Sequence, residues 1–114
     1  MPDISKWDIS NIYDMSLAFC LCNDLIILPD ISKWNTRKIK YMHNLFSDCK
    51  HLLALPDISK WGTPEVVDIT AMFERCYSLS SLPDISKWNL PKLETMFCLF
   101  YECPSLYSLP DISK

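Results

Sequence analysis

The sequence contains a single glycine, Gly62, among its 114 residues. Loops that cradle phosphate groups need several glycines to bring backbone N–H groups close to the ligand, so the composition argues against a phosphate site. Basic residues are also scarce, because 11 Lys and Arg face 14 Asp and Glu and the net charge is −3. A nucleic-acid surface usually needs a basic stripe, and we therefore expect no nucleic-acid partner.

Long hydrophobic runs are missing as well. The densest run, Leu25 to Leu28, is far too short to cross a bilayer, which takes about 20 apolar residues. We therefore expect no membrane insertion. No signal peptide is recognisable before Pro2, which predicts either an intracellular protein or a chain that lacks its leader.

What the sequence does contain is a repeated hexapeptide, Pro-Asp-Ile-Ser-Lys-Trp. It begins at positions 2, 29, 56 and 83 and returns without its tryptophan from position 110, always 27 residues apart. A fixed period of this length is typical of repeat arrays. We predict one domain over residues 1–114, with four full repeats (2–28, 29–55, 56–82 and 83–109) and a partial fifth (110–114).

Apolar residues recur at the same positions of each repeat. They form columns of isoleucine (4, 31, 58, 85, 112), tryptophan (7, 34, 61, 88), phenylalanine (19, 46, 73, 100), cysteine (22, 49, 76, 103) and leucine (25, 52, 79, 106). One 27-residue coil cannot bury its own apolar edge, whereas stacked coils bury a continuous core and contact only their neighbours. The columns therefore predict an α/β repeat solenoid with ladders of like side chains.

Within a repeat, two patterns alternate. Apolar residues at helical spacing in the middle segment predict a short amphipathic helix of about two turns, partly 3₁₀; in the second repeat they are Met42, Leu45, Phe46 and Cys49. The stretch from Leu25 to Ile31 and its equivalents predicts the strand. The proline inside it predicts a bulge or a strand end in every coil.

The run LPDISKW, then an aliphatic residue and Met, then Phe-x-x-Cys-x-x-Leu-x-x-Leu, resembles the repeat of BspA-like bacterial surface proteins, a divergent leucine-rich repeat. The match covers the whole chain, with one extra residue around the Pro-Asp pair, and is carried by residues such as Met96, Phe100, Cys103, Leu106 and Leu109. The resemblance implies a leucine-rich-repeat-like, right-handed stack in which each coil has a short parallel strand and a short α/3₁₀ helix. It also implies a surface or secreted adhesin without catalytic activity, and it transfers no specific functional residue.

The positions between the two strand leucines vary between repeats. In leucine-rich repeats such positions face outward on the concave side, where a strip could bind a protein partner, with an apolar patch at one end and an aromatic anchor at the other. The alternatives are drift on a tolerant surface and partial burial. The predicted strip consists of Ile26, Ile27, Leu53, Ala54, Ser80, Ser81, Tyr107 and Ser108.

Two sets of polar residues could suggest a metal. An aspartate column (3, 30, 57, 84, 111) could bind calcium, but a solvated surface balanced by the lysine column is favoured. Cys20-x-Cys22 and Cys98-x₄-Cys103, with His43 and His51, lack the CxxC pairs typical of zinc sites. We expect no metal, no cofactor and no enzymatic activity, and free buried thiols rather than disulfides.

Two functions stay open on the sequence. The first is a protein-binding module that uses the strip. The second is end-to-end self-association, because both ends carry similar coils and neither has the polar cap that terminal repeats need. A fragment of a longer surface array is a further alternative, since the chain stops inside a PDISKW unit.

Overall fold

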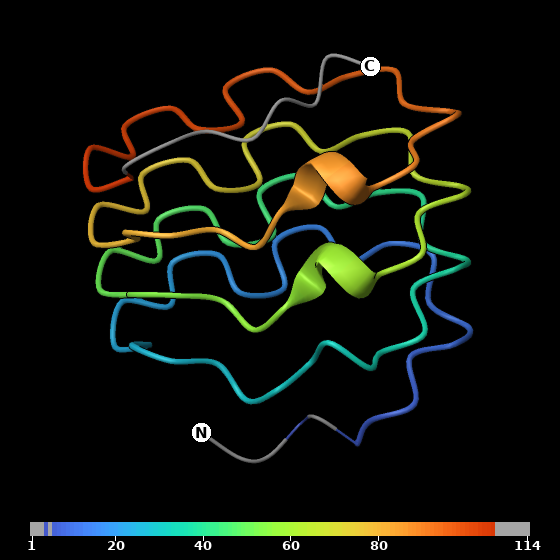
Figure 1. Cartoon of the computed structure of the whole chain (residues 1–114), viewed down its shortest axis with the longest axis horizontal. Coiled ribbons are helices and arrows are strands. Elements are labelled where there is room, and N and C mark those ends of the chain that lie inside the picture. Colours follow the sequence, from blue (N-terminus) through green and yellow to red (C-terminus); the bar gives the residue numbers. More distant parts are fainter. Residues whose placement is uncertain (1–3, 5, 107–114) are drawn as a thin grey trace.

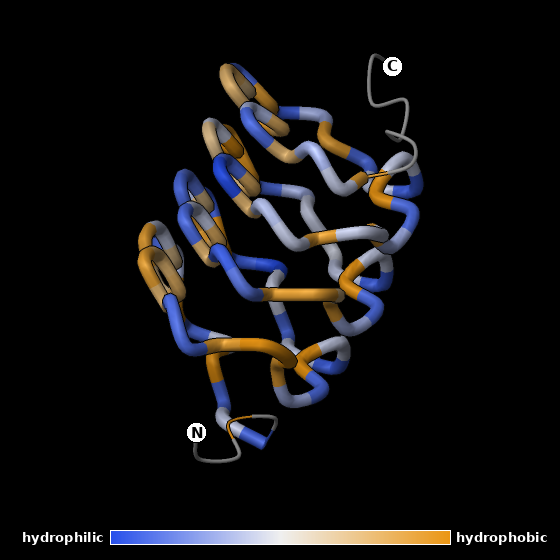
Figure 2. The backbone as a smooth tube through the Cα atoms, turned by 90° about the vertical axis from the view of Figure 1, so that its left-hand side faces the viewer, coloured by the Kyte–Doolittle hydropathy of each residue, from blue (hydrophilic) through white to orange (hydrophobic). Residues whose placement is uncertain are grey.

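The computed structural model describes residue 4 and residues 6–106. The chain winds in coils that lie one above another from the N-terminal to the C-terminal end (Figure 1). Figure 2 shows the same coils from the side as successive layers, each with hydrophobic segments. Residues one repeat apart lie in adjacent layers, since the ring centroids of Trp34 and Trp61 are 6.4 Å apart and those of Trp61 and Trp88 are also 6.4 Å apart.

The phenylalanine column forms a second stack of rings. Successive centroids are separated by 5.5 Å between Phe19 and Phe46, 5.8 Å between Phe46 and Phe73, and 5.7 Å between Phe73 and Phe100. Neighbouring rings are nearly parallel, and these spacings lie within the range favoured by offset aromatic pairs. The two ring stacks belong to one continuous hydrophobic core, which also contains the buried isoleucine column.

Regular secondary structure is sparse in the described part of the chain. It consists of two 3₁₀ helices, η1 (Ile58–Lys60) and η2 (Ile85–Lys87), and a column of isolated parallel bridges that links Asp14, Tyr41, Asp68 and Thr95. Each helix follows an aspartate whose carboxylate accepts a hydrogen bond from the serine N–H two residues on, which caps the turn. The repeated Asp-Ile-Ser sequence therefore makes a local turn.

The middle segment differs from the expected amphipathic helix. In the second repeat, the N–H groups of Leu45, Ser47 and Cys49 donate to carbonyls three residues earlier. The N–H groups that alternate with them donate instead to carbonyls of the following coil. These donors are the N–H groups of Met42, Asn44, Phe46 and Asp48. Half of the donors that an α-helix would use internally thus join one coil to the next.

The backbone supports this alternation with left-handed residues. Asn44 and Asp48 have φ of 57° and 60°, in a region that Asn and Asp tolerate better than most residues. The apolar spacing that predicted a helix is still used for burial, because the four predicted core residues of this segment are all fully buried. The pattern correctly identified the inward face, while the hydrogen bonds between coils determined the backbone.

The stretch predicted as a strand is joined more weakly between coils. The Leu53 N–H donates to the Ile26 carbonyl at 3.0 Å, and the Ser80 N–H donates to the Leu53 carbonyl at 3.2 Å. No strand longer than an isolated bridge forms within residues 6–106. The proline that follows has no N–H and cannot extend the pairing. The right-handed, leucine-rich-repeat-like class stays a prediction.

Candidate functional site

The predicted strip lies on the outer surface between buried leucines. Leu25, Leu52 and Leu79 are buried, whereas the two positions after each of them turn toward solvent to different degrees. The inter-coil hydrogen bonds from Leu53 to Ile26 and from Ser80 to Leu53 bring the variable positions of successive repeats side by side. Six of the eight predicted strip residues are thus adjacent in space, and Tyr107 and Ser108 lie outside the described residues.

The apolar end of the strip is strongly exposed. Ile26, Ile27 and Leu53 have exposed fractions of 53%, 71% and 49%. Along the stack the large apolar side chains give way first to the small Ala54, which is exposed, and then to the polar Ser80 and Ser81, of which Ser81 is exposed and Ser80 half-buried. An apolar cluster of this kind is a common feature of protein interaction surfaces, where it loses its water on binding.

A shallow depression of about 380 Å³ adjoins Ile26 and Leu53. Its other walls are polar and come from Asn23, Asp24, His51 and Ser78. Hydrogen-bonding side chains therefore border the apolar cluster. This arrangement, an apolar centre with a polar rim, is typical of surfaces that bind proteins.

The cysteine column is part of the core. The thiols of Cys49 and Cys76 are buried and donate to the carbonyls of Phe19 and Phe46, at 2.9 and 3.1 Å. Burial raises the pKa of Cys49 to about 12 and raises that of Cys76 as well. Nucleophilic attack and metal binding both require a thiolate, so these thiols are suited to packing. The six cysteines of the chain are all free.

The aspartate column is used for local turns. Asp30 and Asp57 accept hydrogen bonds from Ser32 and Ser59, two residues further on, and these bonds lower the pKa of both carboxyl groups. Both carboxylates stand at the exposed surface. Among the described residues, no group of three or more His, Cys, Asp or Glu side chains is placed to hold a metal ion.

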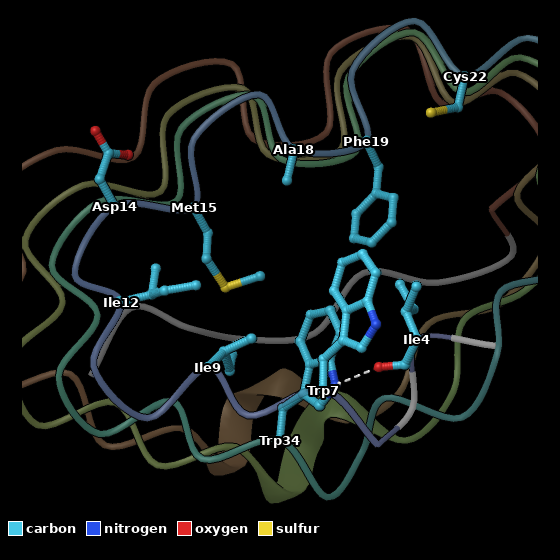
Figure 3. Close-up of a pocket in the computed structure, with 10 residues that line it drawn as sticks. All are labelled: Ile4, Trp7, Ile9, Ile12, Asp14, Met15, Ala18, Phe19, Cys22 and Trp34. Carbon is cyan, nitrogen blue, oxygen red and sulfur yellow. Dashed lines mark hydrogen bonds between the residues drawn. The ribbon is translucent and has the colours of Figure 1, made fainter. Parts of the chain in front are cut away.

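The sequence did not reveal one feature, a cavity of about 370 Å³ at the N-terminal end of the stack. Figure 3 shows Trp7, Ile9, Met15 and Phe19 converging on it from the first coil, next to Trp34 of the second. It is the end of the core that no earlier coil covers in the described structure.

Comparison with known families shows to which family the chain belongs. The sequence profile described as "Mycoplasma protein of unknown function, DUF285" matches residues 1–111, and so covers all four full repeats. The chain belongs to this family. Comparisons with curated proteins and with solved structures give no match.

Membership in DUF285 applies to the repeat array as a whole, because the match begins before the first hexapeptide and ends within the last. The family description assigns no activity, ligand or partner. In the described part of the chain, no helix is both long enough and apolar enough to cross a membrane.

Proposed function

We propose that this chain is a non-enzymatic protein-binding module that presents its variable strip to a protein partner. We further propose that its repeat is a BspA-like, leucine-rich-repeat-like unit, and that the chain acts as an adhesion or interaction module at a cell surface. The observation that carries the proposal is the cluster formed by Ile26, Ile27 and Leu53, three large apolar side chains that are adjacent and exposed.

The position of the cluster supports a binding surface rather than sequence drift on a surface that tolerates substitution. The leucines that precede the variable positions are buried, so the backbone of the strip is held by the core while the variable side chains project outward. A rigid support lowers the ordering cost of association. The polar groups of Asp24 and His51 beside the cluster can supply the hydrogen bonds that fix the orientation of a partner.

The experiment compares capture by the wild-type chain and by the double variant Ile26→Asp, Leu53→Asp. The probe is a preparation of host-cell surface proteins, passed over each immobilised chain and identified by mass spectrometry. We expect a discrete protein that the wild type retains and the double variant loses, because two carboxylates in the cluster would be desolvated on binding.

The matched control is Phe97→Asp, which replaces another exposed apolar residue on the last repeat, away from the strip. It should retain the captured protein. Tryptophan fluorescence should show that all three chains are folded, since the substituted side chains are exposed. Equal capture by the wild type and the double variant would reject the strip, and capture of nothing by the wild type would reject the binding function.

A further inference from the structure

The depression of about 380 Å³ beside the strip combines an apolar wall with a carboxylate. Ile26 and Leu53 form the apolar wall, and Asp24 stands next to them at the exposed surface. The lining residues come from three successive coils, because the depression reaches from Asn23 in the first repeat to Ser78 in the third. It therefore spans two junctions between coils, and its shape is set by neighbours within the chain.

Asp24 differs from the other aspartates in having no partner among the described residues. Six of the others accept a hydrogen bond from the backbone N–H two residues further on; they are Asp8, Asp14, Asp30, Asp57, Asp68 and Asp84. Asp48 forms an ion pair with Arg75 at 3.8 Å. Asp24 is thus the one described aspartate whose charge is not used by the fold.

The basic side chains of the neighbouring coil do not supply the missing partner. Lys50 is exposed, but it does not line the depression and forms no ion pair with a described residue. His51 lines the same depression, and no hydrogen bond joins its ring to Asp24 within the described residues. The Asp24 carboxylate is therefore accessible to a cation from another molecule.

The position of Asp24 also varies between repeats, as the strip itself does. Its equivalents are His51, Ser78 and Ser105, so only the first repeat has a carboxylate there. The aspartate of the hexapeptide is present in every repeat, which agrees with its role in the turn. Asp24 has no such role, and its charge is a property of this one part of the surface.

We propose that the depression is a pocket for an arginine side chain of the partner protein, an inference that rests on the proposed binding function of the strip. The guanidinium lies against the Asp24 carboxylate, and the hydrocarbon stem packs on Ile26 and Leu53. The side-chain oxygens of Asn23 and Ser78 are further acceptors at the rim. The pocket thereby fixes the position of the partner along the strip.

An arginine side chain has both properties that the depression calls for. Its stem is apolar and its planar head is cationic, so it can cover apolar surface while its charge meets a carboxylate. The head can donate two parallel hydrogen bonds to one carboxylate. A purely apolar side chain would instead cover Asp24 and leave its charge without a partner, which is costly, and an acidic side chain would be repelled.

The experiment titrates the isotope-labelled chain with two short peptides that differ in one charge. One is acetyl-Leu-Arg-Leu-amide, and the other has citrulline, a neutral analogue of the same shape, in place of arginine. Chemical-shift changes in amide NMR spectra locate the bound peptide and give its dissociation constant. We expect shifts at Asp24, Ile26 and Leu53, and at least about 5-fold tighter binding of the arginine peptide, the scale of an exposed charge pair.

Two matched variants test the role of the carboxylate. Asp24→Asn removes the charge but keeps the shape, so the two dissociation constants should become nearly equal. Asp30→Asn removes another exposed charge, and asparagine can still accept the hydrogen bond from the Ser32 N–H. It should keep the wild-type preference for arginine. The amide spectrum of each variant shows directly whether it is folded.

Three results would overturn the arginine pocket. Equal dissociation constants of the two peptides for the wild type, or an absence of shifts around the depression, would show that it does not recognise a guanidinium. A preference for arginine that persists in Asp24→Asn would place the cation elsewhere. A preference that is lost equally in Asp30→Asn would assign it to the general charge of the surface.

The capture experiment separates failure of the pocket from failure of the proposed function. If the wild type captures a protein that the double variant Ile26→Asp, Leu53→Asp loses, the strip is a binding surface whatever the peptides do. In that case Asp24→Asn should also retain less of the captured protein than Asp30→Asn does. Equal retention by these two variants would reject the pocket and leave the binding function in place.

Discussion

The first repeat and the inner repeats have nearly the same column residues, but two of the columns, those of Trp7 and Ile12, are exposed in the first repeat and buried in the second. Ile39 and Val66 are fully buried in the second and third repeats, whereas Ile12 is exposed in the first. The local sequences around them are similar, so the difference comes from the coil on the other side. In this fold, burial is a property of two adjacent coils and not of one.

The side chains that face outward from the middle segment also differ between the first and the second repeat. Leu17 and Leu21 are exposed in the first repeat, while the equivalent positions of the second repeat carry Asn44 and Asp48. All four residues have positive φ, so the backbone is the same and only the side-chain chemistry changes. At these two positions the first repeat is thus more apolar on its surface than the second.

The largest expected effect comes from the middle of the phenylalanine stack. Phe73→Ala should lower the free energy of unfolding by about 3–5 kcal/mol, because it removes a fully buried ring that stacks on both Phe46 and Phe100. Urea denaturation at a concentration where the chain is monomeric measures the loss. Phe19→Ala, at the end of the stack with only one phenylalanine neighbour, should lose less.

Equal losses at Phe73 and Phe19 would contradict the view that burial depends on two neighbours. A complete loss of folding in Phe73→Ala would agree with it, since a small domain has little stability to spare. The intermediate variant Phe73→Leu then supplies a measurable midpoint. Its loss should again exceed that of Phe19→Leu.

A smaller effect is expected from the indole hydrogen bonds. Trp61→Phe keeps an aromatic ring between Trp34 and Trp88 but removes the donor to the Ile31 carbonyl, which is buried. We expect a loss of about 1–3 kcal/mol, the typical cost of leaving a buried group unsatisfied. Denaturation of the monomer measures it.

Trp7→Phe is the matched control, because the Trp7 ring is exposed and its indole has no acceptor among the described residues. Its stability as a monomer should be nearly unchanged. If instead it loses as much stability as Trp61→Phe, then Trp7 has a partner within its own chain.

The sequence predicted which residues are core, and the reason is physical. A column that stays apolar through every repeat has to face other coils, whatever the backbone does, so Phe46, Met42 and Leu52 were correctly assigned to the interior. The exposure of Ile26 and Leu53 was expected from the resemblance to leucine-rich repeats, in which the variable positions between the strand leucines face outward.

The backbone of the middle segment could not be predicted in the same way. Apolar residues at a spacing of three and four are compatible with an α-helix and also with a series of turns that buries every third or fourth residue. Carbonyls one repeat away decide between them, because they accept the N–H groups of Asn44 and Asp48. The cavity at the N-terminal end was missed for a related reason, since its walls come from two coils, the first and the second.

The smallest expected effect concerns the thiols, and it vanishes at neutral pH. Burial raises the pKa of Cys49 from its ordinary value of 9.0 to about 12, so the fold favours the neutral thiol. Stability is therefore fully present below pH 9 and falls as pH rises toward 12, because the unfolded chain releases the proton first. Denaturation midpoints measured between pH 7 and pH 10 should decline less in Cys49→Ala than in the wild type. Cys98→Ala, at an exposed thiol, should follow the wild-type slope, and an equal slope for both variants would mean that the Cys49 thiol is solvated in the native state.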